Sequence, residues 1–264
     1  MGHIENIVQT QIETLIKNKP LIIKYRKVND WKDCTMENGV LSQKVSAIAT
    51  RKISFKNKNT QRNFAIVSHL LADIYGMISR NVICTKRELY YRNVQFLKNQ
   101  ASVNRALDSI CSLLNVQVWE LGILSTSKGL IAGDITITLE ENEVINCIGT
   151  KCVPQNPSTI KSVKSEAEYV LVVEKDTVFS RLVNDNFFGR SLKKCILVTA
   201  KGYPDINTRV LLKKIVEKLN IPVYIIVDAD PYGIEIMCTY KFGSLELVEK
   251  SEQLALSTAV EWIG

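Results

Sequence analysis

The second half of the chain alternates between short apolar runs and segments with helical spacing. Three runs rich in β-branched and aromatic residues, over residues 168–173, 193–200 and 221–227, have the pattern of buried strands. Between them, apolar residues recur at steps of three and four over residues 178–183 and 211–219, which predicts two helices. The order strand, helix, strand, helix, strand predicts a parallel sheet with right-handed crossovers.

The first half shows mainly helical spacing. Apolar positions predict an N-terminal amphipathic helix over residues 4–16, a strong helix over residues 64–78 and another over residues 103–114. Thr85 followed three residues later by Glu88 predicts a capping box, and therefore a further helix that begins at this point.

A β-hairpin is expected after these helices. The apolar segments 116–124 and 130–139 flank STSKG, which would place Lys128 and Gly129 at the tip. Three helices and a hairpin predict a winged helix-turn-helix domain, in which the second or third helix meets DNA. The expected division is into an N-terminal arm, a winged-helix domain, a polar linker and an α/β domain, over residues 1–60, 61–140, 141–166 and 167–264.

The positive charge of the chain is concentrated in its first part. Residues 1–110 hold 18 Lys and Arg against 8 Asp and Glu, whereas the remainder holds 16 against 19. This asymmetry favours a polyanionic partner for the first part, most simply a nucleic acid, although a solvated lysine-rich surface has the same composition. No apolar run has membrane-spanning length, and the seven scattered cysteines fit neither a zinc site nor a disulfide framework. We therefore expect an intracellular protein with no membrane partner and with buried, reduced thiols.

Three acidic residues are expected at one edge of the predicted sheet. Glu174 follows the first strand, and Asp228 and Asp230 follow the third as Asp-x-Asp. The carboxyl ends of parallel strands meet at one edge, where open α/β sheets bind ligands. Carboxylates suit Mg²⁺, which leaves positions for water and a substrate phosphate. A solvated acidic turn and a helix-dipole role for Glu174 are the alternatives, and the presence of all three acids favours the metal site.

Tyr91 is the candidate nucleophile. No Cys–His or Ser–His pairing is evident, because neither histidine has an apparent partner in the sequence. Tyrosine hydroxyls have a pKa of about 10 and need nearby positive charge to attack a phosphodiester. Arg87 precedes Tyr91 by one helical turn, and Arg92 is adjacent. On the pattern alone, packing of the Tyr90–Tyr91 pair on the core with one hydroxyl at the surface is the commoner role.

Five motifs of the sequence resemble those of one known family. They are TKRELYYRNVQF, STSKGLIAGD, VVEKDTVFSRLVNDNFF, VTAKGYPDINTR and VDADPYGIEIMCTYKFGS. In this order, from about Arg62 to the end of the chain, they are similar to motifs of the eukaryotic meiotic double-strand-break proteins, relatives of the A subunit of archaeal DNA topoisomerase VI. The resemblance implies a CAP-like winged-helix domain followed by a Toprim domain, a metal-binding α/β fold with a parallel Rossmann-like sheet. The N-terminal 60 residues carry little of it.

The resemblance also implies roles for individual residues. Tyr91 would attack the DNA phosphodiester and become joined to the 5′ end, with Arg87 in a supporting role. The three acids, Glu174, Asp228 and Asp230, would bind Mg²⁺, for which Mn²⁺ could substitute. Residues expected to contact DNA or to help order the site are Lys86, Arg92, Lys128, Lys201, Tyr203 and Arg209.

The expected function is a topoisomerase-like DNA transesterase that makes the double-strand breaks initiating meiotic recombination. Expected partners are double-stranded DNA, a second copy of the chain or a topoisomerase VI B-like subunit, and accessory meiotic proteins, in the nucleus. The tyrosine of one subunit would work with the metal site of the other. No G-x4-G-K-[ST] loop is present, so strand passage would need another subunit.

Two alternatives to this function remain open. They are the A subunit of an ATP-dependent topoisomerase VI and a DNA-binding scaffold that does not cut. Family members continue beyond the point where this chain stops at AVEWIG, so the chain is expected to be a fragment, a C-terminally truncated gene product or a compacted relative.

Overall fold

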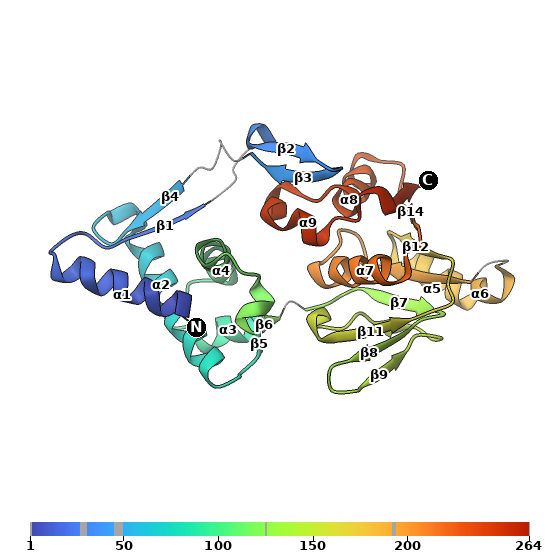
Figure 1. The fold of residues 1–264 in the computed structure, drawn as a ribbon, viewed down its shortest axis with the longest axis horizontal. Helices are drawn as coiled ribbons and strands as arrows, with labels where there is room; N and C mark the ends of the chain where they lie inside the picture. The colour runs from blue at the N-terminus through green and yellow to red at the C-terminus, as the bar shows by residue number, and fades with distance from the viewer. Residues whose placement is uncertain (1, 27–30, 45–49, 125, 192–193, 264) are drawn as a thin grey trace. The chain divides into compact units, whose positions relative to one another are not determined.

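The chain divides into two compact units. The computed structural model describes residues 2–26, 31–44, 50–124, 126–191 and 194–263 (Figure 1). The first unit comprises Met1–Asn29 and Ser46–Ser125, and the second comprises Asp30–Val45 and Thr126–Gly264. Within the described residues, no helix has both the length and the apolar character needed to cross a membrane.

The first unit is mainly helical. Its elements are α1 (Gly2–Ile16), β1 (Ile22–Arg26), β4 (Thr50–Ser54), α2 (Lys58–Ser79), β5 (Cys84–Thr85), α3 (Lys86–Arg92), α4 (Gln100–Leu114), the 3₁₀ helix η3 (Val118–Leu121) and β6 (Ile123–Leu124). Helix α2 buries Leu70 and Ile74 in the same core as Val103 and Leu107 of α4. The apolar residues at helical spacing in both helices therefore face one shared core, as predicted. The helices expected from residues 4, 64, 86 and 103 onward are therefore confirmed.

The predicted hairpin after these helices is wrong. Residues Val118–Leu121 form η3, and β6 then pairs in parallel with β5. Strand β7 (Leu130–Gly133) instead belongs to the second unit, where it pairs with β13 (Cys195–Thr199). Because Ile131, Ala132 and Gly133 are all buried, this run suits a central strand and not a solvated wing. Three helices with a two-stranded β5–β6 pair are present, but Lys128 is not at a wing tip.

The second unit is an α/β structure. Besides β7 and β13 it contains η1 (Trp31–Asp33), β2 (Cys34–Glu37), β3 (Val40–Gln43), β8 (Thr136–Leu139), β9 (Val144–Asn146), β10 (Lys151–Cys152), η4 (Pro157–Thr159), β11 (Ile160–Lys164), β12 (Tyr169–Val173), α5 (Asp176–Asn184), α6 (Phe187–Arg190), α7 (Ile206–Leu219), β14 (Val223–Ile226), α8 (Pro231–Lys241), η5 (Leu245–Lys250), α9 (Ser251–Leu254), η6 (Ser257–Ala259) and β15 (Val260–Trp262).

The main sheet of this unit is mixed. Its strand order is β10-β7-β13-β12-β14-β15. Strands β13, β12, β14 and β15 run in parallel, as the strand–helix–strand pattern predicts, whereas β7 and β10 are antiparallel additions. The expected parallel sheet is thus confirmed for its centre.

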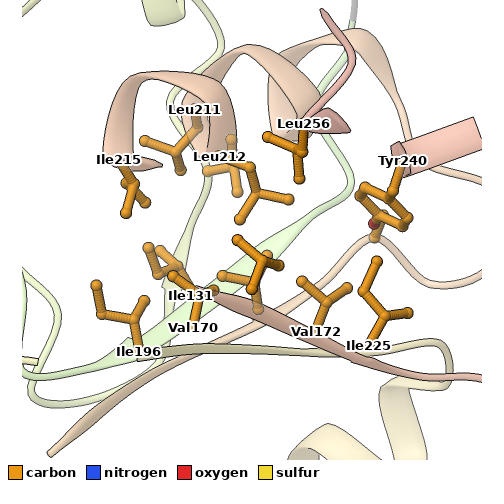
Figure 2. Packing of buried hydrophobic residues seen from close by; sticks show 14 of the residues in the cluster. Ile131, Val170, Val172, Ile196, Leu211, Leu212, Ile215, Ile225, Tyr240 and Leu256 are labelled. Carbon is orange, nitrogen blue, oxygen red and sulfur yellow. The ribbon is translucent and has the colours of Figure 1, made fainter. Parts of the chain in front are cut away.

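Helices cover both faces of this sheet. Val170 and Val172 point to the face covered by α7 and α8, where they meet Leu212 and Tyr240 (Figure 2). The alternate residues of β12 point to the opposite face, where Phe179 of α5 lies in the same cluster. The loop after β12 therefore leads to one face and the loop after β14 to the other. In open α/β sheets this reversal leaves a crevice between the two strand ends.

The segment expected to be a polar linker, residues 141–166, contains strands. Strands β9 and β11 pair antiparallel with the two edges of β8, and β10 pairs with β7. Strand β11 buries only Ile160 and Val163, and β9 and β10 have no fully buried residue. Because these strands are largely exposed, their polar composition is the same as that of a linker. The division between the units therefore falls near residue 125 and not at residue 140.

The first 60 residues are shared between the units. Ile4, Ile23 and Ile53 lie in the core of the first unit. The β2–β3 hairpin lies in the second unit, where the backbone N–H of Leu41 donates to the carbonyl oxygen of Phe242 at 2.8 Å. These residues therefore pack within the two units and do not form the separate N-terminal arm that the sequence predicts.

Five of the seven cysteines are buried, as predicted, whereas Cys152 is exposed and Cys238 is half-buried. Burial raises the pKa of the Cys147 thiol to about 11, so this thiol is almost fully protonated at neutral pH. The buried cysteines serve as packing residues.

Candidate active site

Glu174 and Asp228 lie together at the carboxyl edge of the main sheet. Strands β12 and β14 pair in parallel, with Val173 opposite Ile226, so the residues that follow them are neighbours. The backbone N–H of Asp228 donates to Oε2 of Glu174 at 2.9 Å. Two carboxylates therefore lie at the carboxyl ends of these adjacent strands, as the sequence predicts.

Asp230 begins the next helix. Its Oδ1 accepts a 2.7 Å hydrogen bond from the backbone N–H of Gly233, and Pro231 occupies the first turn of α8. A Cβ at Gly233 would lie 2.1 Å from the carbonyl oxygen of Asp228, which requires glycine here. The close approach of α8 to Asp228 thus sets the geometry of both aspartates.

Lys175 also belongs to this acidic edge, and the sequence reasoning missed it. Its Nζ lies 2.6 Å from Oδ2 of Asp228, and both side chains are about half exposed. The hydrogen bond with Asp228 raises the pKa of Lys175. The available signal was its place directly after Glu174 in VVEK.

The donor chemistry of this edge fits a divalent cation. Glu174 and Asp228 offer carboxylate oxygens from adjacent strand ends, and the Lys175 ammonium shows that a cation is accommodated beside Asp228. Across the part of the chain that the structure describes, however, no group of three or more His, Cys, Asp or Glu side chains is arranged to hold a metal ion. Glu174 and Asp228 are therefore a contacting pair, and Asp230 is used in the cap of α8.

The loop after β13 is attached to the same edge. The backbone N–H of Gly202 and the hydroxyl of Thr199 both donate to the carbonyl oxygen of Glu174, at 2.9 and 3.2 Å. Lys201 adopts a left-handed conformation with φ 58°, and its Nζ lies 3.1 Å from Oδ2 of Asp176. Lys201 thus lies beside the acidic edge and is paired with Asp176.

Tyr203, in the same loop, is exposed and donates a short hydrogen bond to Oε2 of Glu235 on α8. This bond to a carboxylate raises the pKa of Tyr203 to about 12. The contact ties the loop after β13 to α8 and leaves the Tyr203 side chain exposed at the surface.

Arg209 does not fit direct contact with DNA, because its side chain is only 1% exposed. Its Nε and Nη2 atoms are buried and have no hydrogen-bond partner among the residues that the structure describes, and burial lowers the pKa of the guanidinium to about 10. Arg209 precedes Leu212 by three residues, so it lies on the apolar face of α7, and this spacing was the available signal. Only the expected ordering role is compatible with its position.

Lys128 is exposed beside the carboxyl edge of the sheet. The antiparallel pairing of β7 with β13 places Leu130 opposite Thr199. A Cβ at the buried Gly129 would lie 2.2 Å from Oγ1 of Thr208, so the backbone next to Lys128 packs closely on the start of α7. Lys128 therefore lies near the acidic edge of the sheet and not at the tip of a wing, where the sequence predicts it.

Tyr91 lies on α3 in the first unit. The predicted capping box is present: the backbone N–H of Glu88 donates to Oγ1 of Thr85 at 3.1 Å, and the Glu88 carboxylate accepts from the Thr85 N–H. Arg87 and Tyr91 are four residues apart and both exposed, Tyr91 to 59%. Tyr90 packs against the core with its ring centroid 5.5 Å from that of Tyr91. Tyr91 is thus the accessible member of the pair.

The two other basic residues expected at this helix flank the exposed tyrosine. Lys86 is the first residue of α3 and is half-buried, and Arg92 is the last and is exposed. Sixteen Lys and Arg stand against six Asp and Glu in the first unit, compared with 18 against 21 in the second. The unit that carries Tyr91 therefore has the excess of positive charge that suits a polyanion.

A buried polar network fixes the end of α3, and it was missed from the sequence. Nε2 of His69 and Oδ1 of Asn93 are 2.6 Å apart, and Nδ2 of Asn93 donates to Oδ2 of Asp73 at 2.9 Å. Nδ2 also donates to the carbonyl oxygen of Leu89. Since Asn93 terminates α3, these bonds hold the helix bearing Tyr91 against α2.

Comparison with known proteins identifies the family. Residues 169–264 match the family model for the Toprim domain of the topoisomerase 6 A subunit and Spo11, and residues 62–123 match that for type IIB DNA topoisomerase. The chain is 38% identical over 267 residues to meiotic recombination protein SPO11 of Homo sapiens, covering 100% of this chain and 67% of the relative. It is 35% identical over 217 residues to meiotic recombination protein W68 of Drosophila melanogaster, covering 81% and 65%. It is 32% identical over 270 residues to the A subunit of DNA topoisomerase 6 of Arabidopsis thaliana, covering 97% and 62%.

The chain thus spans about two thirds of the length of the human relative and less of the other two. The second unit contains a Toprim domain, as the motifs suggest. The matches to meiotic recombination proteins and to a topoisomerase 6 protein cover most of this chain, so the chain belongs to the family formed by Spo11 and the A subunits of topoisomerase 6.

Proposed function

We propose that this protein is a topoisomerase-like DNA transesterase that makes double-strand breaks in meiotic recombination. The observation that carries the proposal is the exposed Tyr91 beside Arg87, on a basic unit of a chain whose other unit is a Toprim domain with paired acids. Names of relatives that include meiotic recombination protein and DNA topoisomerase support this class of reaction.

In the proposed reaction, Oη of Tyr91 attacks the phosphorus of a phosphodiester. A new O–P bond forms as the bond from phosphorus to the 3′ oxygen breaks, and the tyrosine proton ends on the departing 3′ hydroxyl. The products are a 5′-phosphotyrosyl link and a free 3′ end, so no water is consumed. Arg87, one turn before Tyr91, places positive charge beside the nucleophile.

Glu174 and Asp228 would hold the divalent cation, with Asp230 as a further candidate ligand. When bound, Mg²⁺ or Mn²⁺ supplies positive charge to the phosphate oxygens in the transition state. The hydrogen bond from the backbone of Asp228 to Glu174 would hold the two residues in place to bind the cation.

The substrate and assembly follow from this chemistry. A double-strand break needs two nucleophiles, so we propose a homodimer or an assembly with a topoisomerase VI B-like subunit, in which Tyr91 of one copy works with the acids of the other. Exposed Lys128 and Arg92, with Lys86, Lys201 and Tyr203, are the proposed contacts with duplex DNA. Accessory meiotic proteins and a nuclear location fit the same role.

A second candidate, a DNA-binding scaffold that does not cut, is favoured by one observation. Lys175 already neutralises Asp228, and no metal-binding group of three is formed among the residues described. A carboxylate that is neutralised in this way is compatible with a protein that binds DNA without cutting it.

Covalent trapping separates the two candidates. The protein is incubated with radiolabelled duplex DNA and Mg²⁺ or Mn²⁺ and then denatured, and label on the protein is measured for the wild type, Tyr91→Phe, Tyr90→Phe and Asp228→Asn. Cleavage predicts label on the wild type and on Tyr90→Phe, and none on the other two. Metal-dependent DNA binding without label on the wild type would favour the scaffold.

A further inference from the structure

Lys175 places a protein cation on a carboxylate that a metal ion would use. Its Nζ lies 2.6 Å from Oδ2 of Asp228, beside the carboxyl ends of the paired strands β12 and β14. The residue before it is Glu174, whose Oε2 accepts from the backbone of Asp228. Lys175 is therefore part of the acidic edge by position and by contact.

A divalent cation that binds Oδ2 of Asp228 competes with the Lys175 ammonium for that oxygen. Both are positive, and their repulsion is large at contact distance. A divalent cation carries twice the charge and can bind Glu174 and Asp228 together, whereas the ammonium forms its ion pair with Asp228. We therefore expect a metal that takes this oxygen to release Lys175.

The displaced side chain has a ready alternative partner. Lys175 is 55% exposed, so its ammonium can turn outward without crossing the core. A DNA phosphate drawn to the bound cation would lie beside it, and a lysine pairs well with such an anion. Lys201, another lysine at this edge, is held by Asp176, so the metal would not release it from Asp228.

We propose that Lys175 is a positioning residue that exchanges partners, holding Asp228 while the site lacks metal and binding a DNA phosphate once a divalent cation has displaced it. This inference rests on the proposed metal site at Glu174 and Asp228. It couples the two ligands: the metal releases the lysine that helps to hold DNA.

The proposal predicts effects of opposite sign from one substitution. Lys175→Met removes the competitor of the cation, so affinity for Mn²⁺ in the absence of DNA should rise by about two- to fivefold, the range expected for an exposed ion pair. The same substitution should abolish most of the gain in DNA affinity that Mg²⁺ produces. If Lys175 only stabilised the fold, its substitution would not raise the affinity for Mn²⁺ while reducing the effect of Mg²⁺ on DNA affinity.

The experiment uses the full 264-residue chain. Free Mn²⁺ is followed by electron paramagnetic resonance without DNA, and binding of a fluorescent duplex is followed by anisotropy in Mg²⁺ and in EDTA. Lys194→Met is the matched control, because Lys194 is 56% exposed in the same unit and pairs with Glu166. It precedes β13, at the opposite edge of the parallel strands from Glu174. Asp228→Asn tests the metal site itself.

The outcomes separate the inference from the function on which it rests. Tighter Mn²⁺ binding and a lost metal effect on DNA in Lys175→Met, with neither change in Lys194→Met, support the exchange. Unchanged or weaker Mn²⁺ binding in Lys175→Met overturns it, and so does an intact metal effect on DNA. Absence of Mn²⁺ binding by the wild type, or equal binding by Asp228→Asn, would instead refute the proposed metal site.

Discussion

The backbone N–H of Asp228 donates a 2.9 Å hydrogen bond to Oε2 of Glu174, which joins the ends of two neighbouring strands. The glutamate thus has two separable properties: an oxygen that accepts this bond and a negative charge. Its accepting oxygen fixes the loop after β14, and its charge serves the proposed metal.

Substitutions at Glu174 can separate these two properties. Glu174→Gln keeps an accepting oxygen and should leave the melting temperature within about a degree of wild type while weakening Mn²⁺ binding at least about tenfold. Glu174→Ala loses the acceptor as well and should also lower the stability, by about 1 kcal/mol. Calorimetric unfolding and Mn²⁺ titration measure the two effects. Equal Mn²⁺ affinity in Glu174→Gln and the wild type would contradict the assignment.

Gly233 allows the first turn of α8 to approach Asp228. In Gly233→Ala the new Cβ would lie 2.1 Å from the carbonyl oxygen of Asp228, so the helix or the loop must move. We expect a loss of stability of about 1–3 kcal/mol together with weaker metal binding. Gly149→Ala is the control, because no atom of the described residues lies within 4 Å of a Cβ placed there. A neutral Gly233→Ala would show that the approach is not required.

Asn93 secures the helix that bears Tyr91. Asn93→Ala removes the bonds to Asp73 and Leu89 and leaves buried polar groups unpaired, so denaturant unfolding should show a loss of about 1–3 kcal/mol. Covalent adduct formation should fall as well, since the position of α3 is no longer fixed. The exposed Gln95, two residues further on, provides the control Gln95→Ala. Similar stability of the two variants would refute the role of the network.

The Tyr203–Glu235 pair predicts a pH dependence at the alkaline end. The pKa of Tyr203 is raised to about 12 in the folded protein, above the value of about 10 for an unpaired tyrosine. The contribution of the pair to stability is therefore complete below about pH 10 and is lost as the pH rises through about 12.

Tyrosinate absorbance in the near ultraviolet tests this shift. The difference titration between the wild type and Tyr203→Phe isolates Tyr203, and repeating it on the Glu235→Gln background should move the midpoint toward about 10, the value of an unpaired tyrosine. An unchanged midpoint on that background would mean that Glu235 does not cause the shift.

The central fold and the acidic edge could be predicted because they follow from local rules. Buried strands form continuous apolar runs, and residues that follow parallel strands must meet at one edge. Glu174 and Asp228 could therefore be paired across 54 positions of sequence, and the structure joins them.

The other features depend on partners that local patterns do not reveal. From the sequence pattern alone, the run Leu130–Gly133 could form a wing strand or a sheet strand, and it is the pairing with β13 that buries it in the main sheet. Asn93 has a partner on another helix, and Lys175 has the pattern of an ordinary surface lysine until β14 brings Asp228 beside it. Such contacts arise from tertiary packing, so the sequence alone could not supply them.

The most direct test of the central claim is to map the DNA-linked residue. The covalent adduct is digested with nuclease and protease, and mass spectrometry locates the nucleotide left on the protein. We predict a 5′-phosphonucleotide on Tyr91, formed only with a divalent cation and absent from Asp228→Asn. A nucleotide on Tyr90 or on another residue, or an adduct that persists in Tyr91→Phe, would contradict tyrosine transesterification at this site.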